Sequence, residues 1–277
     1  MNVIKLAAFS DKQSGGNPAG VALVSALPSP AKMQQTAADV GFSETVFAQM
    51  LGDKDHWRVR YFSPESEVAF CGHATIALGS TLAEKYGNGT YHLTLNETTI
   101  TVEGISDSSH SLAALQSPPT HHSILSDDEI SSTLELFSYK KNQISSEIPP
   151  AKIHAGADHY VIALKSRADL SAMNYDLQEG REFMRSRKLV TIMFVVAAPN
   201  NVFHVRNAFA SGGVFEDPAT GAAAAAFSGY LRDTQQSSDQ INIIQGEDMG
   251  ERSLIKCQFT QKLGSSIRVS GTSRTLG

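Results

Sequence analysis

Apolar residues recur at helical spacing in the segment that follows residues 71–73, which read Cys-Gly-His. The recurring positions lie at i, i+3, i+4 and i+8 and are Ala74, Ala77, Leu78 and Leu82. Just before them, residues 59–62 and 68–70 are rich in strand-forming side chains. A strand, a glycine turn and a helix start leave several backbone N–H groups without intrahelical partners, and such a helix end attracts an anion.

The same order of features returns late in the chain, where residues 214–221 lead into an apolar helical segment over residues 222–231. Gly221 follows Gly72 by 149 positions (221 − 72). With this offset, four apolar residues of the second segment fall on the four of the first: Ala223, Ala226, Phe227 and Leu231. The repetition predicts that the chain consists of two related halves.

Segments with strand character outnumber helical ones in the rest of the chain. Further helices are predicted over residues 30–40, 130–137 and 176–186, the first capped by Ser29 and ended by Gly41. Strands are predicted over residues 3–8, 21–24, 42–47, 91–95, 99–102, 112–115, 159–164, 189–197, 241–244, 253–259 and 266–269. The predicted fold class is α+β, with each half a curved, mostly antiparallel sheet around a central helix.

The chain has 277 residues, which is enough for two domains that each bury a core. A Pro-rich, loop-like stretch over residues 117–122 is the expected crossing between them. We therefore expect domains over residues 1–117 and 118–265, with the C-terminal strand, residues 266–277, joining the first.

Composition excludes several classes of protein. Charged residues make up 18% of the chain and the net charge is −5, without the cationic face that nucleic-acid binding needs. The longest apolar runs are too short to cross a bilayer, and no export signal begins the chain. Two cysteines, Cys71 and Cys257, provide no disulfide framework and too few metal ligands. We therefore expect a soluble, cytoplasmic protein without a bound metal.

Three side chains of the first half are candidates for chemistry. Glu44 lies in a predicted strand among apolar neighbours, where it is either an exposed carboxylate or a proton shuttle. His73 lies just inside a helix start, where the macrodipole favours a neutral ring that donates a hydrogen bond. Cys71 is a candidate nucleophile. A mechanism with two thiols is disfavoured, because Gly221 has no cysteine beside it and Cys257 lies in another predicted strand.

The second half offers an aspartate at the equivalent helix start. Asp217-Pro218 suits simple capping of the first helical turn, and it suits a functional role equally well. Thr220-Gly221 and the alanines at 222–226 permit a ligand to approach closely, because no side chain larger than a methyl group projects after the glycine. Neither of the common phosphate-binding glycine motifs is present.

Together these pieces resemble the PhzF family, the phenazine-biosynthesis isomerases and their relatives. The matching segments occur in the same order along nearly the whole chain. They are Gly16-Asn17-Pro18, Phe42-Ser43-Glu44-Thr45, Tyr61-Phe62-Ser63-Pro64, Glu67-Val68, Phe70-Cys71-Gly72-His73-Ala74-Thr75, Glu216-Asp217-Pro218-Ala219-Thr220-Gly221, Gln245-Gly246 with Gly250, and Val269-Ser270-Gly271.

The resemblance implies a diaminopimelate-epimerase-like fold of two pseudo-symmetric domains with the active site in the cleft between them. It implies an isomerase that moves a carbon-bound proton on a small carboxylate-bearing substrate, without a metal or organic cofactor, and commonly as a homodimer. The implied catalytic residues are Glu44, His73 and Asp217. The implied substrate-binding positions are Asn17, Gly72, Ala74, Thr220, Gly221 and Ala222.

Ala222 departs from the pattern of the phenazine-pathway members, which carry a serine at this position. Losing one hydrogen-bonding group of the site is expected to change which substrate fits. Two alternatives stay open. The chain is either a racemase or epimerase that uses Cys71 as a base, or a non-catalytic homologue that binds a small molecule.

Overall fold

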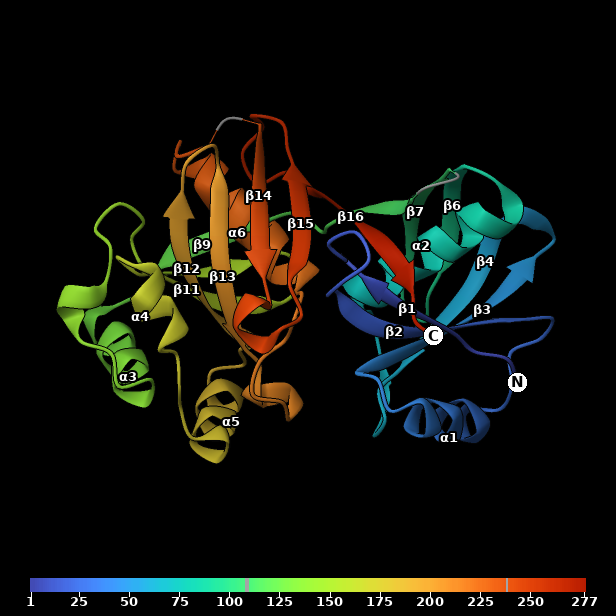
Figure 1. The fold of residues 1–277 in the computed structure, drawn as a ribbon, viewed down its shortest axis with the longest axis horizontal. Helices are drawn as coiled ribbons and strands as arrows, with labels where there is room; N and C mark the ends of the chain where they lie inside the picture. The colour runs from blue at the N-terminus through green and yellow to red at the C-terminus, as the bar shows by residue number, and fades with distance from the viewer. Residues whose placement is uncertain (108–109, 238) are drawn as a thin grey trace. The chain divides into compact units, whose positions relative to one another are not determined.

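The computed structural model describes residues 1–107, 110–237 and 239–277, and the chain divides into two compact units (Figure 1). Unit 1 comprises Met1–Gln116 with Ser270–Gly277, and unit 2 comprises Ser117–Val269. The sequence places the first domain boundary after residue 117, and the structure places it after residue 116. The second boundary is expected after residue 265 and lies after residue 269.

Unit 1 is a closed sheet around one helix. Its strands follow one another in space as β1 (Ile4–Ala8), β2 (Asn17–Val24), β3 (Glu44–Leu51), β4 (Asp53–Phe62), β6 (Gly89–Thr94), β7 (Thr99–Ser106), β8 (Ser111–Gln116) and β16 (Arg268–Thr275). The short strand β5 (Glu67–Val68) pairs with β4. Because β16 also pairs with β1, this series of strands closes on itself. The β2–β3 and β4–β6 pairs are parallel, and most of the others are antiparallel, as predicted.

The helix inside this sheet is α2 (Gly72–Tyr86), which is buried from His73 to Ala83. Two glycines permit its close approach to the sheet. A Cβ on Gly79 would lie 2.6 Å from Val102 and 2.9 Å from Ala113, and a Cβ on Gly104 would strike the Gly79 carbonyl. A second helix of the unit, α1 (Pro30–Val40), covers the outer side of the sheet.

Unit 2 also packs one sheet around a central helix. Its strands lie in the order β15 (Ser253–Gln258), β14 (Gln240–Gln245), β13 (Val202–Ala208), β12 (Thr191–Ala198), β11 (Asp158–Ala163), β10 (Ala151–His154) and β9 (His121–Ile124). The central helix is α6 (Gly221–Asp233), which is buried from Ala223 to Arg232. Backbone hydrogen bonds from Ser117 to Ile267 (2.8 Å) and from Thr120 to Gly264 (3.0 Å) join the beginning of the unit to its end.

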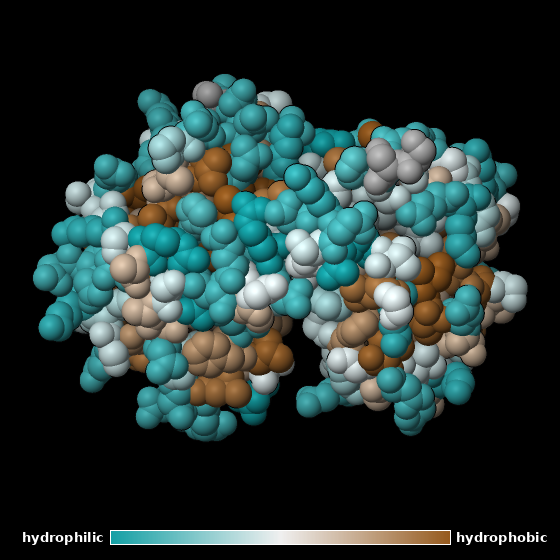
Figure 2. All heavy atoms as spheres, in the orientation of Figure 1, coloured by the Kyte–Doolittle hydropathy of each residue, from teal (hydrophilic) through white to brown (hydrophobic). Residues whose placement is uncertain are grey.

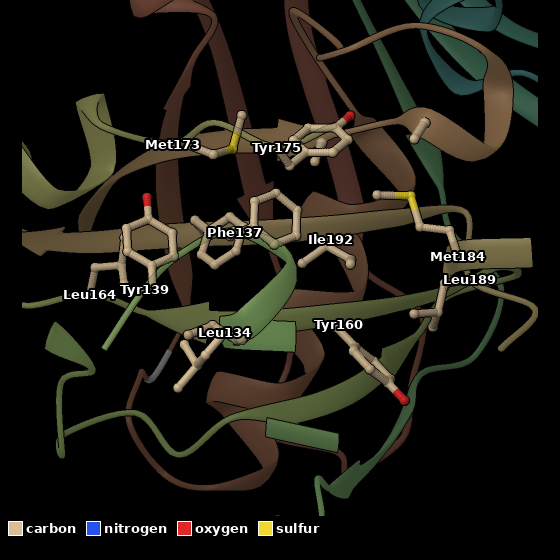
Figure 3. Packing of buried hydrophobic residues seen from close by; sticks show 14 of the residues in the cluster. Leu134, Phe137, Tyr139, Tyr160, Leu164, Met173, Tyr175, Met184, Leu189 and Ile192 are labelled. Carbon is tan, nitrogen blue, oxygen red and sulfur yellow. The ribbon is translucent and has the colours of Figure 1, made fainter. Parts of the chain in front are cut away.

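Three helices cover the outer face of this second sheet: α3 (Asp127–Leu136), α4 (Arg167–Ser171) and α5 (Leu177–Ser186). Short 3-10 turns are η1 (Lys141–Gln143), η2 (Ala210–Gly212) and η3 (Glu247–Met249). The helices and the sheet share an aromatic-rich core, which includes Phe137 and Tyr175 (Figure 3). The ring centroid of Phe137 lies 4.8 Å from that of Tyr175 and 4.6 Å from that of Phe194. The edge-to-face contact between Phe137 and Phe194 is one of the geometries that aromatic pairs prefer.

Some element predictions are wrong. Residues 121–122 were expected in a loop, but they begin strand β9, and strand β10 and helix α4 were not predicted at all. The β9 sequence, HHSI, has no apolar alternation, so its strand conformation comes from pairing with β10.

The visible surface is mainly hydrophilic, with separate hydrophobic patches on each unit (Figure 2). None of the helices in the described residues has both the length and the apolar character required to span a membrane.

The fold predicts a pH dependence of stability through His159 on β11. Its ring is fully buried, its Nδ1 atom lies 2.7 Å from the Thr191 hydroxyl, and burial lowers the pKa of His159 from 6.5 to about 3. The unfolded chain therefore binds one more proton than the folded chain between these pH values. Stability from this group is present above pH 6.5 and is lost as the pH falls toward 3.

We expect His159→Asn, which keeps a polar atom near Thr191, to flatten the fall of unfolding free energy below pH 6.5 by up to about 1.4 kcal/mol per pH unit. Urea unfolding of both proteins between pH 4 and pH 7 measures the two slopes. Parallel slopes would contradict the prediction.

Candidate functional site

The two central helices begin differently from the outer ones. Side chains cap α1, α3, α4 and α5, and the capping residues are Ser29, Ser126, Ser166 and Asp176. Among the described residues, no side-chain cap hydrogen bond is made at Cys71 before α2 or at Thr220 before α6. The first backbone N–H groups of both central helices are therefore not capped from their own N-cap side chain, which suits them to an anionic ligand.

Both glycines that the sequence repeat aligns begin one of these helices, since Gly72 is the first residue of α2 and Gly221 the first of α6. A Cβ built on Gly72 would meet no heavy atom within 4 Å. Packing in unit 1 therefore does not require glycine there, and the space is open to a ligand. Ala74 is fully buried, so its contribution to binding a ligand would come from its backbone N–H.

In unit 1 the start of α2 lies beside the start of β3. The His73 Nε2 atom is 3.3 Å from Glu44 Oε2 and 3.3 Å from the Ser43 hydroxyl. The Cys71 sulfur is 3.4 Å from Nδ1 and 3.8 Å from Nε2 of the same ring. Three possible metal-ligand atoms lie within 4.8 Å of one another: a carboxylate oxygen of Glu44, the Cys71 sulfur and a ring nitrogen of His73. The structure thus brings together the three candidates of the first half.

The His73 ring is held from its other side by β2. The Asn17 side-chain amide nitrogen is 3.4 Å from Nδ1, and the ring also hydrogen-bonds to the Pro18 backbone. Burial lowers the pKa of His73, while the Glu44 charge and the Pro18 backbone oppose that shift. The sequence predicts a neutral ring from the helix macrodipole, whereas burial is the largest cause in the structure.

In unit 2 the corresponding loop is held by one amide. Gln245, buried at the end of β14, donates from Nε2 to the Asp217 carbonyl (2.6 Å) and to the Thr220 hydroxyl (3.0 Å). Its Oε1 atom accepts from the Thr220 backbone N–H at 3.3 Å. The Asp217 N–H in turn donates to the carbonyl of Asn207 on β13 (3.0 Å).

These bonds orient the Asp217 carboxylate. The Thr220 hydroxyl accepts a hydrogen from Gln245, so it directs its own hydrogen to Asp217 Oδ2. The carboxylate oxygen is therefore an acceptor in this network. Gly246, which follows the amide, has a φ of +77°, and a Cβ on it would lie 2.9 Å from the Pro218 carbonyl, so both conformation and space require glycine.

Ala222 is the second residue of α6 and, like Gly221 and Thr220, is partly exposed. The first turn of α6 therefore presents backbone and methyl groups where the phenazine-pathway pattern has a hydroxyl.

Cys257 belongs neither to the cluster around His73 nor to the Asp217 loop. It lies buried on β15, and burial raises the pKa of its thiol to about 12. A thiolate at Cys257 is therefore unfavourable.

The sequence motifs alone did not predict that Gln245 and Ser43 are parts of the sites. Gln245 belongs to a motif near the end of the sequence. Its hydrogen bonds to Asp217 and Thr220 join residues that are 28 and 25 positions apart, which no local pattern reveals. Ser43 was quoted in the motif before Glu44, yet its distance to the His73 ring depends on strand and helix being neighbours.

Comparison with known proteins agrees with this fold and with these motifs. The family model of the phenazine biosynthesis-like proteins, PhzC-PhzF, matches residues 6–276. The chain belongs to the PhzF family and is thereby an isomerase.

The uncharacterized isomerase YddE of Escherichia coli K12 is 27% identical over 281 residues, covering 96% of this chain and 93% of that protein. The PhzF-family phenazine biosynthesis protein of Bacillus anthracis superposes with a TM-score of 0.87 at 20% identity, over 99% of this chain and 96% of that one. A probable proline racemase from Agrobacterium radiobacter K84 has a TM-score of 0.68 at 11% identity, over 99% and 91% of the two chains. These structures confirm the predicted epimerase-like fold; the homodimer and the cytoplasmic location stay predictions.

The Gln245 network predicts a specific loss of stability. We expect Gln245→Leu, which leaves the Asp217 carbonyl and both Thr220 groups without this partner, to lower the unfolding free energy by about 1–3 kcal/mol. The amide of Thr220 should also exchange with deuterium faster. The control is Gln178→Leu on the exposed face of α5, where one side-chain contact to Glu182 is lost and little change is expected. Equal stability of the two variants would contradict the assignment.

Proposed function

We propose that this PhzF-family isomerase moves a carbon-bound proton on a small carboxylate-bearing substrate, with Glu44 as the single acid–base residue. The observation that carries the proposal is the cluster of Glu44 and His73 at the uncapped start of α2. It combines a proton acceptor, a ring that orients it, and backbone N–H groups suited to an anion.

The chemistry needs only groups of the chain and the substrate. Glu44 removes a proton from a carbon conjugated to a carboxylate or carbonyl, and the electron pair of the broken C–H bond moves into the conjugated system. Backbone N–H groups at Gly72 stabilise the resulting enolate charge. The protonated Glu44 then returns its proton to another carbon on the same face of the substrate. Proton transfer by a positioned side chain contributes about 10²–10⁴-fold, so electrostatic stabilisation must supply the remainder.

His73 positions the base in the proposal. Its Nε2 atom lies 3.3 Å from Glu44, so the ring sets the direction of the carboxylate. Asn17 holds the opposite side of the ring at 3.4 Å, which keeps that direction constant.

The Asp217 loop is proposed to bind and orient polar groups of the substrate. Its carboxylate is an acceptor tied to Thr220, which suits it to a hydrogen-bond donor on the ligand. Gly221 and Ala222 offer backbone N–H groups at the start of α6. Since Ala222 lacks a hydroxyl, the proposed substrate differs in its polar groups from the phenazine precursor.

A racemase with Cys71 as second base is the main alternative, because the sulfur lies close to the His73 ring. Two bases on opposite faces of one carbon, each about 3–3.5 Å from it, must be roughly 6–7 Å apart. The donor atoms of Glu44 and Cys71 are within 4.8 Å. This separation favours one base over a flanking pair.

The substrate is best sought without guessing its identity. Purified protein incubated in deuterated water with a panel of small carboxylates should introduce deuterium into one of them, detected by mass spectrometry. A panel in which ligands raise the melting temperature but none exchanges or reacts would instead favour the non-catalytic binder.

Glu44→Gln should lower kcat on that substrate by at least about 100-fold, because the amide accepts no proton. The control is Glu65→Gln, which changes an exposed glutamate of the same unit and should keep full activity. Circular dichroism checks that both variants fold. Normal turnover by Glu44→Gln would show that another group is the base.

Cys71→Ser separates the two candidate mechanisms. If Glu44 is the only base, the hydroxyl is a sufficient replacement beside His73, and kcat should stay within about threefold of the unchanged protein. If Cys71 is a base, the far less acidic serine should abolish turnover. Steady-state rates of the variant on the identified substrate decide between them.

A further inference from the structure

We propose that Glu44, Cys71 and His73 form a binding site for one zinc-like divalent cation, and that this ion blocks the acid–base residue. The site itself rests only on the three side chains. The blocking effect rests on the proposed function, and the experiment below separates the two.

The distances suit tetrahedral coordination. Zinc binds imidazole nitrogen and carboxylate oxygen at about 2.0–2.2 Å and thiolate sulfur at about 2.3 Å, so neighbouring donors of a tetrahedron are roughly 3.3–3.6 Å apart. In the structure His73 Nε2 lies 3.3 Å from Glu44 Oε2 and 3.8 Å from the Cys71 sulfur. The three donor atoms all lie within 4.8 Å of one another. Adjustments of about an ångström in two side chains would complete three corners of the tetrahedron.

The backbone holds the donors close together. Cys71 and His73 are the N-cap and second residue of α2, and Glu44 is the first residue of β3, which pairs with β2. Asn17 on β2 contacts Nδ1 of the ring, so Nε2 is the atom directed to Glu44. In metal sites a histidine ligand donates its other ring N–H to a carbonyl or carboxylate. The Pro18 backbone, whose only polar group is a carbonyl, hydrogen-bonds to this ring.

The chemistry of the donors selects the kind of ion. One imidazole, one thiolate and one carboxylate suit zinc or cobalt, whereas magnesium and calcium prefer oxygen ligands alone. Binding forms one bond from the metal to nitrogen, one to oxygen and one to sulfur, and the Cys71 thiol proton passes to solvent. The fourth corner is left for water, as in zinc sites with three protein ligands.

The site is sheltered but open on one side. The side chains of His73 and Glu44 are 9% and 16% exposed, and Cys71 is 8% exposed. An ion can therefore reach the cluster past Glu44 while being largely removed from solvent. Once there, it occupies the carboxylate oxygen that the proposed mechanism uses, so the enzyme should lose proton transfer.

Cobalt(II) is the probe, because a bound thiolate produces a near-ultraviolet charge-transfer band and tetrahedral geometry produces intense visible bands. The whole protein is stripped with a chelator, desalted, kept reduced with a non-thiol reductant and titrated with cobalt. The expected result is one equivalent bound, with both sets of bands. An equivalent of zinc should abolish the bands, and a hundredfold excess of magnesium should leave them in place.

Two cysteine variants make the test specific. Cys257→Ser, which removes the buried thiol of β15, should keep the bands, and Cys71→Ser should lose the charge-transfer band and bind at least tenfold more weakly. Glu44→Gln should weaken cobalt binding as well. No thiolate band at saturating cobalt, or an unchanged band in Cys71→Ser, would overturn the proposal.

The spectroscopic result does not depend on turnover. If cobalt binds as described and Glu44→Gln keeps full activity, the metal site stands and the proposed acid–base role fails. If Glu44→Gln is inactive and cobalt produces no thiolate band, the proposed acid–base role stands and the metal site fails.

Discussion

A helix enclosed by a closed sheet can meet a ligand only at its ends, and this constraint organises the site. In unit 1, α2 is buried from His73 to Ala83, so its sides are occupied by packing against the sheet. Its first turn emerges beside the start of β3, which places His73 next to Glu44. The outer helices have polar side-chain caps, whereas the N-cap residues of the two central helices, Cys71 and Thr220, make no side-chain cap hydrogen bond. Backbone N–H groups at such helix starts attract anions.

The parts of the fold that could be predicted are those with local signals in the sequence. Apolar periodicity located both central helices, and the 149-residue offset aligned Gly72 with Gly221, which each begin one. The local signals at Ser29 and Gly41 likewise bounded α1 correctly. Such signals are local, so they can be read from the sequence before the fold is known.

What could not be predicted depends on contacts between distant parts of the chain. Strand β9 has no apolar alternation and acquires its conformation from β10. The closure of unit 1 requires β1 to pair with β16, in which Leu6 lies opposite Thr275. Gln245 holds the Asp217 loop through side-chain hydrogen bonds that cannot be predicted from the spacing of residues in the sequence. Counting two cysteines also suggested too few metal ligands, whereas the fold adds a histidine and a glutamate beside one of them.

The short distance between the donor atoms of Glu44, His73 and Cys71 connects these inferences. It is short enough for one ion to be shared and too short for two bases on opposite faces of a carbon. The same spacing supports the proposal that one carboxylate both removes and returns the proton.

The most direct measurement uses substrate deuterated at the carbon that loses its hydrogen and follows a single turnover in ordinary water. With one shielded carboxylate as the only base, part of the deuterium should reappear at the new position within the same molecule. Complete loss of the label to solvent in every product molecule, with a solvent proton at the new carbon, would contradict a single shielded base.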